Sequence, residues 1–228
     1  HTLTAISGYS SYSFDKRLDS DFGPANRLGS GFAEQFDQFS QEIRLVSPTD
    51  GALEYIVGGY FHVNDYDLTG VTRTLSTAGV LVSNSERFFR QENTAWSGFG
   101  SLTYKFGDAL RVSGSIRYTS DKKDANQDTR LNGATIRTLT GKRDESGWDP
   151  SVNLQWNVTD GAMLYASWGQ GSKAGGFIGG QGATLQAQFQ IEPESSETWE
   201  AGVKLALLDR KLRVNLALFN TTFTNLQV

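Results

Sequence analysis

The feature that most constrains this chain is a pair of alternating segments joined by a short polar turn, which recurs along the sequence. In LLDRKLRVNLALF, residues 207–219, every second residue after the turn is aliphatic: Leu212, Val214, Leu216 and Leu218. A period of two predicts a β-strand with one apolar face. A second sheet, a helix or lipid has to cover that face.

Four short turns of this kind separate the strand-like segments. They are SPTDGA (47–52), FGDA (106–109), VTDGA (158–162) and LLDRK (207–211), and each holds an aspartate. Asp and Gly tolerate the backbone angles of tight hairpin turns. Longer polar stretches lie between the hairpins, at 15–31, 64–86, 120–144 and 173–190. We interpret these stretches as long loops.

Together with the opening segment TLTAISGYSSYSF, the pattern predicts nine antiparallel strands in up-and-down order. Connections in compact soluble domains usually run about 4 to 6 residues, so four long loops would be unusual there. Short turns at one end and long loops at the other are typical of an outer-membrane barrel. This asymmetry favours an all-β fold, an antiparallel up-and-down transmembrane β-barrel, over a soluble β-sandwich.

Composition excludes several other classes of protein. Only 38% of the chain is hydrophobic, and no segment approaches the run of about 18 apolar residues that a transmembrane helix needs. The net charge is −4 and the 21 basic residues are scattered, which argues against a nucleic-acid partner. Because the chain has no cysteine, it has neither a disulfide framework nor a thiolate metal site.

Aromatic residues fall in two rows along the predicted strands. Tyr104, Phe106 and Trp156 lie just before short turns, and a second row lies roughly ten residues away, at Trp96, Tyr118, Trp148, Trp168 and Trp199. Two rows separated by one strand crossing are typical of the two interfaces of a membrane. The same residues would also suit the core of a soluble β-sandwich, so both interpretations stay open at this point.

Two long segments carry a family resemblance. WDPSVNLQWNVTDGAMLYASWGQGSKAGGF and IEPESSETWEAGVKLALLDRKLRVNLALFNTTFTNLQ resemble the barrel of the TonB-dependent outer-membrane receptors, with the turn, the GGF strand end and the later PE-to-Gln hairpin in the family's order. FSQEIRLVSP, GGYF at 58–61 and GSIRYTSDKKD at 114–124 resemble middle strands of that family. The resemblance covers most of residues 36–228.

The resemblance implies a barrel of about 22 strands, closed by an amino-terminal plug and importing a scarce ligand on energy from the inner-membrane TonB complex. We therefore expect residues 1–228 to be a partial receptor barrel, with the plug domain and the remaining strands absent from this chain. The opening HTLTAIS, without an initiator Met, agrees with a piece of a longer protein. The implied location is the outer membrane of a Gram-negative bacterium.

The expected ligand is a ferric siderophore, and a glycan, such as an oligosaccharide, or cobalamin is the alternative. The other implied partners are outer-membrane lipid and the TonB complex, reached through the missing plug. No nucleic acid and no cofactor are expected. A secreted or surface all-β carbohydrate-binding or adhesion module is the competing class, and a glycoside hydrolase ranks last because no paired carboxylates point to it.

No catalytic or metal motif is complete. GQGSKA at 169–174 fits a loose dinucleotide pattern, but no helix can follow it in AGGFIGGQG. DANQDT at 124–129 fails as an EF-hand at its sixth and twelfth positions. His62 has no partner residues that would make a metal site or activate a nucleophile. We therefore predict that the protein is not an enzyme.

Binding residues are predicted on the polar strand faces and around the long loops. The polar faces, which would line the lumen, carry Arg44, Arg111 and Arg117. Residues in or near the loops that would face outside are Tyr66, Arg73, Arg87, Phe88, Arg90 and Phe177. Cations together with aromatic rings suit an anionic chelate or a sugar. For each single arginine, pairing with a carboxylate of the lumen or plug is the alternative.

Overall fold

The computed structural model of the protein describes residues 1–24, 27–180 and 183–227. The strands are β1 (Thr2–Asp19), β2 (Leu28–Val46), β3 (Leu53–Leu75), β4 (Leu81–Phe106), β5 (Leu110–Leu131), β6 (Ala134–Thr159), β7 (Ala162–Lys173), β8 (Gly176–Phe177), β9 (Gln190–Ile191), β10 (Glu194–Leu207) and β11 (Leu212–Thr224), with one short 3-10 helix, η1 (Gln186–Gln188). No helix in the described ranges is long and apolar enough to cross a membrane.

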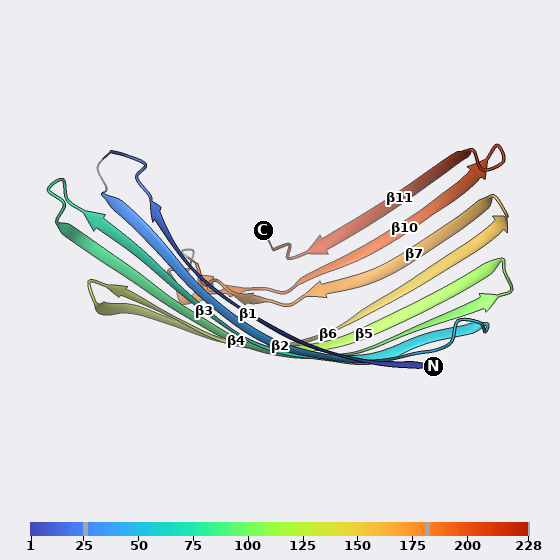
Figure 1. The fold of residues 1–228 in the computed structure, drawn as a ribbon, viewed down its shortest axis with the longest axis horizontal. Coiled ribbons are helices and arrows are strands. Elements are labelled where there is room, and N and C mark those ends of the chain that lie inside the picture. The colour runs from blue at the N-terminus through green and yellow to red at the C-terminus, as the bar shows by residue number, and fades with distance from the viewer. Residues whose placement is uncertain (25–26, 181–182, 228) are drawn as a thin grey trace.

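Nine of these strands form one antiparallel sheet in the order β1-β2-β3-β4-β5-β6-β7-β10-β11. Each strand pairs with its neighbour in sequence, apart from the β8–β9 hairpin inserted between β7 and β10. The predicted up-and-down order of nine strands is therefore confirmed. The four short turns also lie where they were predicted, at one end of the sheet (Figure 1).

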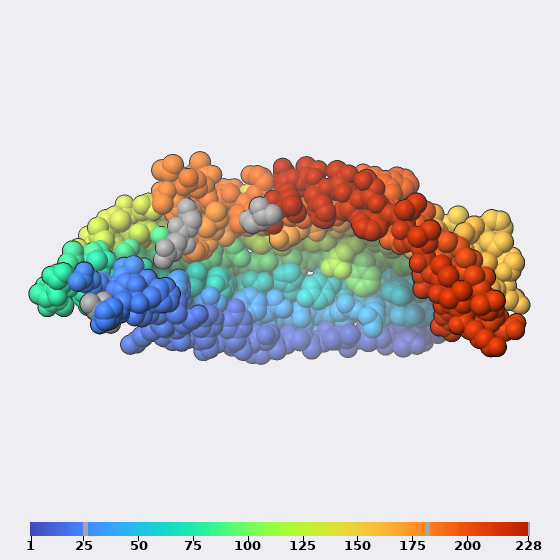
Figure 2. Space-filling view, turned by 90° about the horizontal axis from the view of Figure 1, so that it is seen from above, coloured from blue at the N-terminus to red at the C-terminus, as the bar shows by residue number. Residues whose placement is uncertain are grey.

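The sheet is bent into a trough (Figures 1 and 2). Figure 2 looks into its hollow, with the edge strands β1 and β11 along opposite sides. The segments of residues 174–180 and 183–192, which together we call the folded-back loop, lie inside this hollow, in the half of the sheet farther from the short turns. We call the hollow side the concave face and the other side the convex face.

The convex face carries the alternating apolar residues. Leu216 and Leu218 are 60% and 74% exposed, and in the described part of the chain no second sheet or helix covers them. The second aromatic row also lies on this face: Trp96 and Tyr118 are 5.4 Å apart between ring centroids, and Tyr118 and Trp148 are 4.8 Å apart. An uncovered apolar face bordered by aromatic rings is typical of a surface that contacts lipid. In a β-sandwich, a second sheet would cover this face.

One expectation about the loops needs correction. Of the four polar stretches, 64–86 and 120–144 consist almost entirely of paired strand, and 15–31 is strand at both ends. The physical reason is that strands can continue beyond the aromatic row with polar residues on both faces, which leaves no apolar alternation in the sequence. Only 173–190 is largely the loop that we predicted.

Candidate functional site: the concave face under the folded-back loop

A small hydrophobic cluster fixes the folded-back loop to the concave face. Its buried members are Phe89 on β4, Ala125 on β5, Leu139 on β6, and Phe177, Ala183 and Phe189 of the loop. Tyr66, Leu68 and Ile178 pack against them. The rings of Phe177 and Phe189 lie 5.1 Å apart between centroids. This cluster contains six of the seven buried hydrophobic residues in the described ranges.

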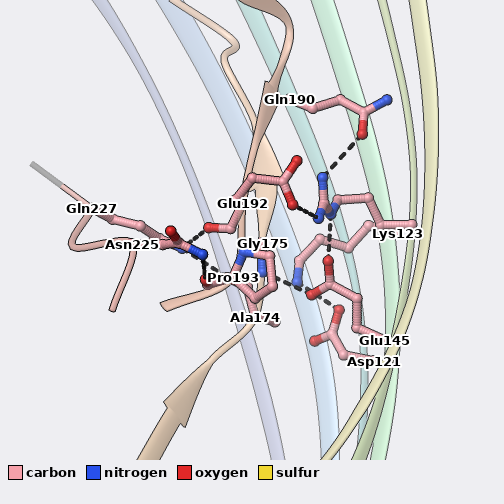
Figure 3. A network of polar contacts seen from close by, with 11 residues as sticks. Asp121, Lys123, Glu145, Ala174, Gly175, Gln190, Glu192, Pro193, Asn225 and Gln227 are labelled. Atoms are coloured by element: carbon pink, nitrogen blue, oxygen red, sulfur yellow. Dashed lines mark hydrogen bonds and ion pairs between the residues drawn. The ribbon is translucent and has the colours of Figure 1, made fainter. Parts of the chain in front are cut away.

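The base of the loop is held by a polar network (Figure 3). Arg143 on β6 donates from Nε to Glu145 at 2.5 Å, from Nη1 to Gln190 at 2.9 Å and from Nη2 to Glu192 at 3.1 Å. Glu145 in turn accepts the backbone N–H of Gly175 at 2.8 Å. Two side chains of β6 therefore contact both ends of the same loop.

Residues of the GGF strand end and of the PE-to-Gln hairpin, both named in the sequence analysis, meet at this base. Gln227 donates from Nε2 to the carbonyl oxygens of Ala174 and Glu192, at 3.3 and 2.8 Å. Its backbone N–H donates to Glu194 at 2.8 Å. Gly175, from the GGF element, has no room for a side chain, since an added Cβ would lie 2.5 Å from the carbonyl oxygen of Ile191. Residues of the GGF strand end and of the PE-to-Gln hairpin thus hold the two ends of the folded-back loop together.

Charges alternate on the strands beneath this base. Lys123 donates to Asp121 at 2.5 Å on β5, and both side chains are largely buried. On the neighbouring strand β6, Arg143 lies opposite Lys123 and Glu145 opposite Asp121. Desolvation opposes the charge on Arg143, yet its hydrogen bonds to Glu145 and Glu192 dominate and hold the guanidinium pKa above its ordinary value.

A pocket of about 240 Å³ lies between the folded-back loop and strands β2 to β4. Its lining includes Phe32, Leu68, Gly70, Arg87 and Gly180. Arg87 enters it half-buried, and its Nη1 donates to the carbonyl oxygen of Gly180 at 2.9 Å. The pKa of Arg87 is lowered, first by burial and then by the nearby charge of Arg137.

Several polar atoms on the concave side of β4 and β5 are buried without a partner among the described residues. They are Nε of Arg87, Oγ1 of Thr129 and both amide atoms of Gln127, whose side chain is fully buried. An unsatisfied buried polar atom costs about 1 to 3 kcal/mol. A group of such atoms in one place indicates a position where a ligand, a water molecule or an ion can bind.

The predicted binding residues divide between the two faces. Arg44, Tyr66, Arg87, Arg111, Arg117 and Phe177 lie on the concave side, whereas Arg73, Phe88 and Arg90 lie on the convex side. Of the concave residues, the fold brings Tyr66, Arg87 and Phe177 together around the loop. Arg44 pairs with Glu42 at 3.1 Å, and Arg117 lies over the rings of Tyr60 and Phe99 at 5.9 and 5.8 Å.

The convex residues have other neighbours. Arg90 pairs with Glu92 at 3.1 Å, and Arg130 stacks over Phe88 at 4.7 Å. Sequence reasoning missed Arg137, Gln127 and Phe189 at the concave site. Arg137 alternates with Leu139, which is a signal that a strand assignment for this stretch would have revealed. In the described ranges no group of three or more His, Asp or Glu residues is arranged to hold a metal ion.

Solved structures share this fold. The ferric yersiniabactin uptake receptor FyuA from Yersinia pestis superposes with a TM-score of 0.81 at 18% identity, over 99% of this chain and 34% of that one. The siderophore receptor PiuA from Acinetobacter baumannii gives a TM-score of 0.69 at 16% identity, over 95% of this chain and 37% of that one. These likenesses confirm the barrel-wall fold.

Sequence comparison gives the family. The chain is 28% identical over 116 residues to the metal-pseudopaline receptor CntO of Pseudomonas aeruginosa, covering 51% of this chain and 15% of that receptor. The sequence profile described as "TonB dependent receptor-like, beta-barrel" matches residues 1–228. Proteins of this kind are transport receptors of the Gram-negative outer membrane and not enzymes, as the sequence predicted. The chain belongs to the TonB-dependent receptor-like β-barrel family.

Proposed function

We propose that this chain is part of the wall of an outer-membrane receptor that imports a scarce metal chelate, with a ferric siderophore as the leading candidate. In this proposal a plug domain and further strands complete the receptor, and the TonB complex supplies the energy through the plug. The chain spans 15% of the curated relative and about a third of the two solved structures, so these parts would lie outside it.

The observation that carries the proposal is the contrast between the two faces of one sheet. The convex face offers uncovered leucines and an aromatic row to lipid, and the concave face offers cations, aromatic rings and unsatisfied polar atoms. A wall with these faces separates lipid from an aqueous lumen. The printed names of the relatives, which refer to metal-pseudopaline and ferric yersiniabactin, support a metal chelate as cargo.

Uptake by whole cells tests the proposal. Cells that express the full-length receptor should accumulate a radiolabelled metal chelate, such as metal-pseudopaline or ferric yersiniabactin, and lose this uptake when the receptor gene or TonB is deleted. Unlabelled chelates then compete in the order of their affinity. Uptake that persists without TonB would contradict the proposed energy source, and a protein that is soluble without detergent would contradict the membrane location.

A further inference from the structure

Two arginines on neighbouring positions of the concave face, Arg87 and Arg137, have no counter-ion among the described residues, and Arg87 lines the pocket. In the register of the sheet, Arg87 on β4 is opposite Thr129 on β5, and Thr129 is opposite Arg137 on β6. Neighbouring strands lie about 4.8 Å apart, so the two arginine backbones are about 10 Å from each other. Two arginine side chains can span that distance and converge above the threonine.

Neither arginine has an acidic partner within the described ranges. No carboxylate there lies within 4.0 Å of the guanidinium nitrogens of Arg87 or Arg137, although Arg44 and Arg143 on the same face are paired. Two like charges that share a half-buried position repel each other, and burial removes the water that would screen them. The lowered pKa of Arg87 has these two causes. The position is therefore electrostatically unsatisfied.

Buried polar atoms also point to a missing group. Thr129, which lies between the two arginines, is 4% exposed, and its hydroxyl finds no partner among the described residues. The Nε of Arg87 is likewise buried and free within those residues. A group with several acceptor oxygens would satisfy two guanidinium groups and one hydroxyl together. Planar carboxylates match the fork of arginine donors in this way.

The size of the adjacent pocket limits what can bind. Its volume of about 240 Å³ is below the roughly 300 to 1,000 Å³ of sites that enclose a whole small molecule. Apolar side chains, Phe32 and Leu68, form part of its wall. The pocket therefore suits one arm of a larger ligand, with a short carbon chain against the wall and its anionic end at the arginines.

We propose that Arg87, Thr129 and Arg137 form a subsite for a carboxylate arm of the imported chelate. This inference rests on the proposed function and makes it narrower, since it selects carboxylate-bearing chelates over neutral glycans. Arg87 and Arg137 hold the two carboxylate oxygens, Thr129 donates its hydroxyl, and the pocket encloses the neighbouring carbons. The subsite lies beside the folded-back loop, so that ligand binding and loop position are coupled through Gly180, whose carbonyl oxygen accepts from Arg87.

Titration calorimetry on the full-length receptor in detergent tests the subsite, with citrate as the probe and glycerol and inorganic phosphate as comparison compounds. Citrate should bind saturably, more weakly at high salt, and with a Kd raised about tenfold or more in the Arg87→Gln/Arg137→Gln double variant. Arg87→Lys should recover part of the affinity because it keeps the charge. The convex-face variant Arg130→Gln is the matched control and should bind citrate as the wild type does.

Three results would overturn the subsite. They are absence of saturable citrate binding to the wild type, an unchanged Kd in the double variant, and phosphate binding as tight as citrate. A structure of the full-length receptor in which one of its own carboxylates occupies both guanidiniums would also overturn it. Gel shifts on heating show whether each variant is folded.

Whole-cell uptake separates this inference from the proposed function. If cells take up the chelate in a TonB-dependent way but the double variant binds citrate as the wild type does, the subsite is refuted and the transport function stands. If citrate binding depends on the two arginines but cells show no TonB-dependent uptake, the transport function is refuted and the subsite stands.

Discussion

Arg143 and Glu192 are held 3.1 Å apart although they lie 49 positions apart in the chain. The same guanidinium also binds Glu145, which anchors the other end of the folded-back loop at Gly175. Arg143 and its partner Glu145 therefore hold the two ends of the loop to the wall, and Gln227 bridges the same two ends. The hydrogen bonds of Arg143 and Glu145 therefore fix the folded-back loop to β6.

Arg143→Gln is expected to free the loop base. Because the Arg143 side chain is only 10% exposed, its removal leaves Glu145 without its charge partner, and the free energy of local opening should fall by about 3 kcal/mol. Hydrogen exchange of the amides in 176–180 and 183–190 measures this. Arg90→Gln, which removes an exposed ion pair, should leave the same amides protected. Equal protection in the two variants would contradict the anchoring role.

Gly141→Ala should displace Phe177. A Cβ on Gly141 would lie 2.2 Å from a ring carbon of Phe177, so the ring has to move out of the cluster at a cost of about 1 to 3 kcal/mol. The amide of Ile178, which donates to Phe189 at 2.9 Å, should exchange faster. Gly98→Ala is the control, because nothing lies within 4 Å of its added Cβ. A second change, Phe177→Leu, should restore part of the lost protection.

The two faces of β11 should respond oppositely to a charge. Leu216→Arg places a cation in lipid near the middle of the strand and should lower the free energy of unfolding by about 2 to 4 kcal/mol. Asn215→Arg, one residue earlier, points to the concave side and should change it little. Urea unfolding of the full-length receptor in lipid vesicles compares the two. Similar losses in both variants would argue against lipid on the convex face.

The loop between β1 and β2 should respond to acid through Asp21. Its carboxylate accepts the backbone N–H groups of Gly23, Arg27 and Leu28, which lower its pKa from 3.8 to about 2. Because the folded pKa lies below the unfolded one, the stabilisation is complete above about pH 4 and is lost as the pH falls through about 2. The amide chemical shift of Gly23 should titrate with that midpoint. In Asp21→Asn this titration should disappear, and a midpoint near 4 in the wild type would contradict the contact.

Strands that cross the lipid were predictable, because one of their faces is apolar. Val152 and Leu154 alternate with Asn153, and the period alone assigned them to a strand. The strand extensions were not predictable in this way, since both of their faces are wet. Lys122 pairs with Asp144 and Lys142 with Asp124 across β5 and β6, at 2.8 and 2.5 Å, and these contacts depend on a register that sequence alone does not give. The Asn132–Gly133 turn, a strong hairpin signal, could have revealed them.

The candidate site was partly predictable. Tyr66, Arg87 and Phe177 were named from their residue types, and the fold brings them to one place. Arg137 was missed because its importance comes from Arg87, a residue on β4 that is separated from β6 by one strand. Arg73 and Arg90 are arginines in the same kind of polar stretch as Arg87, yet their side chains lie on the other face of the sheet. Because successive residues of a strand point to opposite faces, a shift of one residue in the strand assignment changes the predicted face.

The long paired strands have a consequence for recognition. β4 begins at Leu81 and β6 at Ala134, so Arg87 and Arg137 lie on paired strands and not in loops. The backbone of the concave surface around them is therefore ordered before any ligand arrives. A surface carried by mobile loops loses backbone conformational entropy on binding, about 1 to 2 kcal/mol for each residue whose backbone becomes fixed. Much of that loss has already occurred during folding here, and a dilute ligand can be captured with fewer contacts.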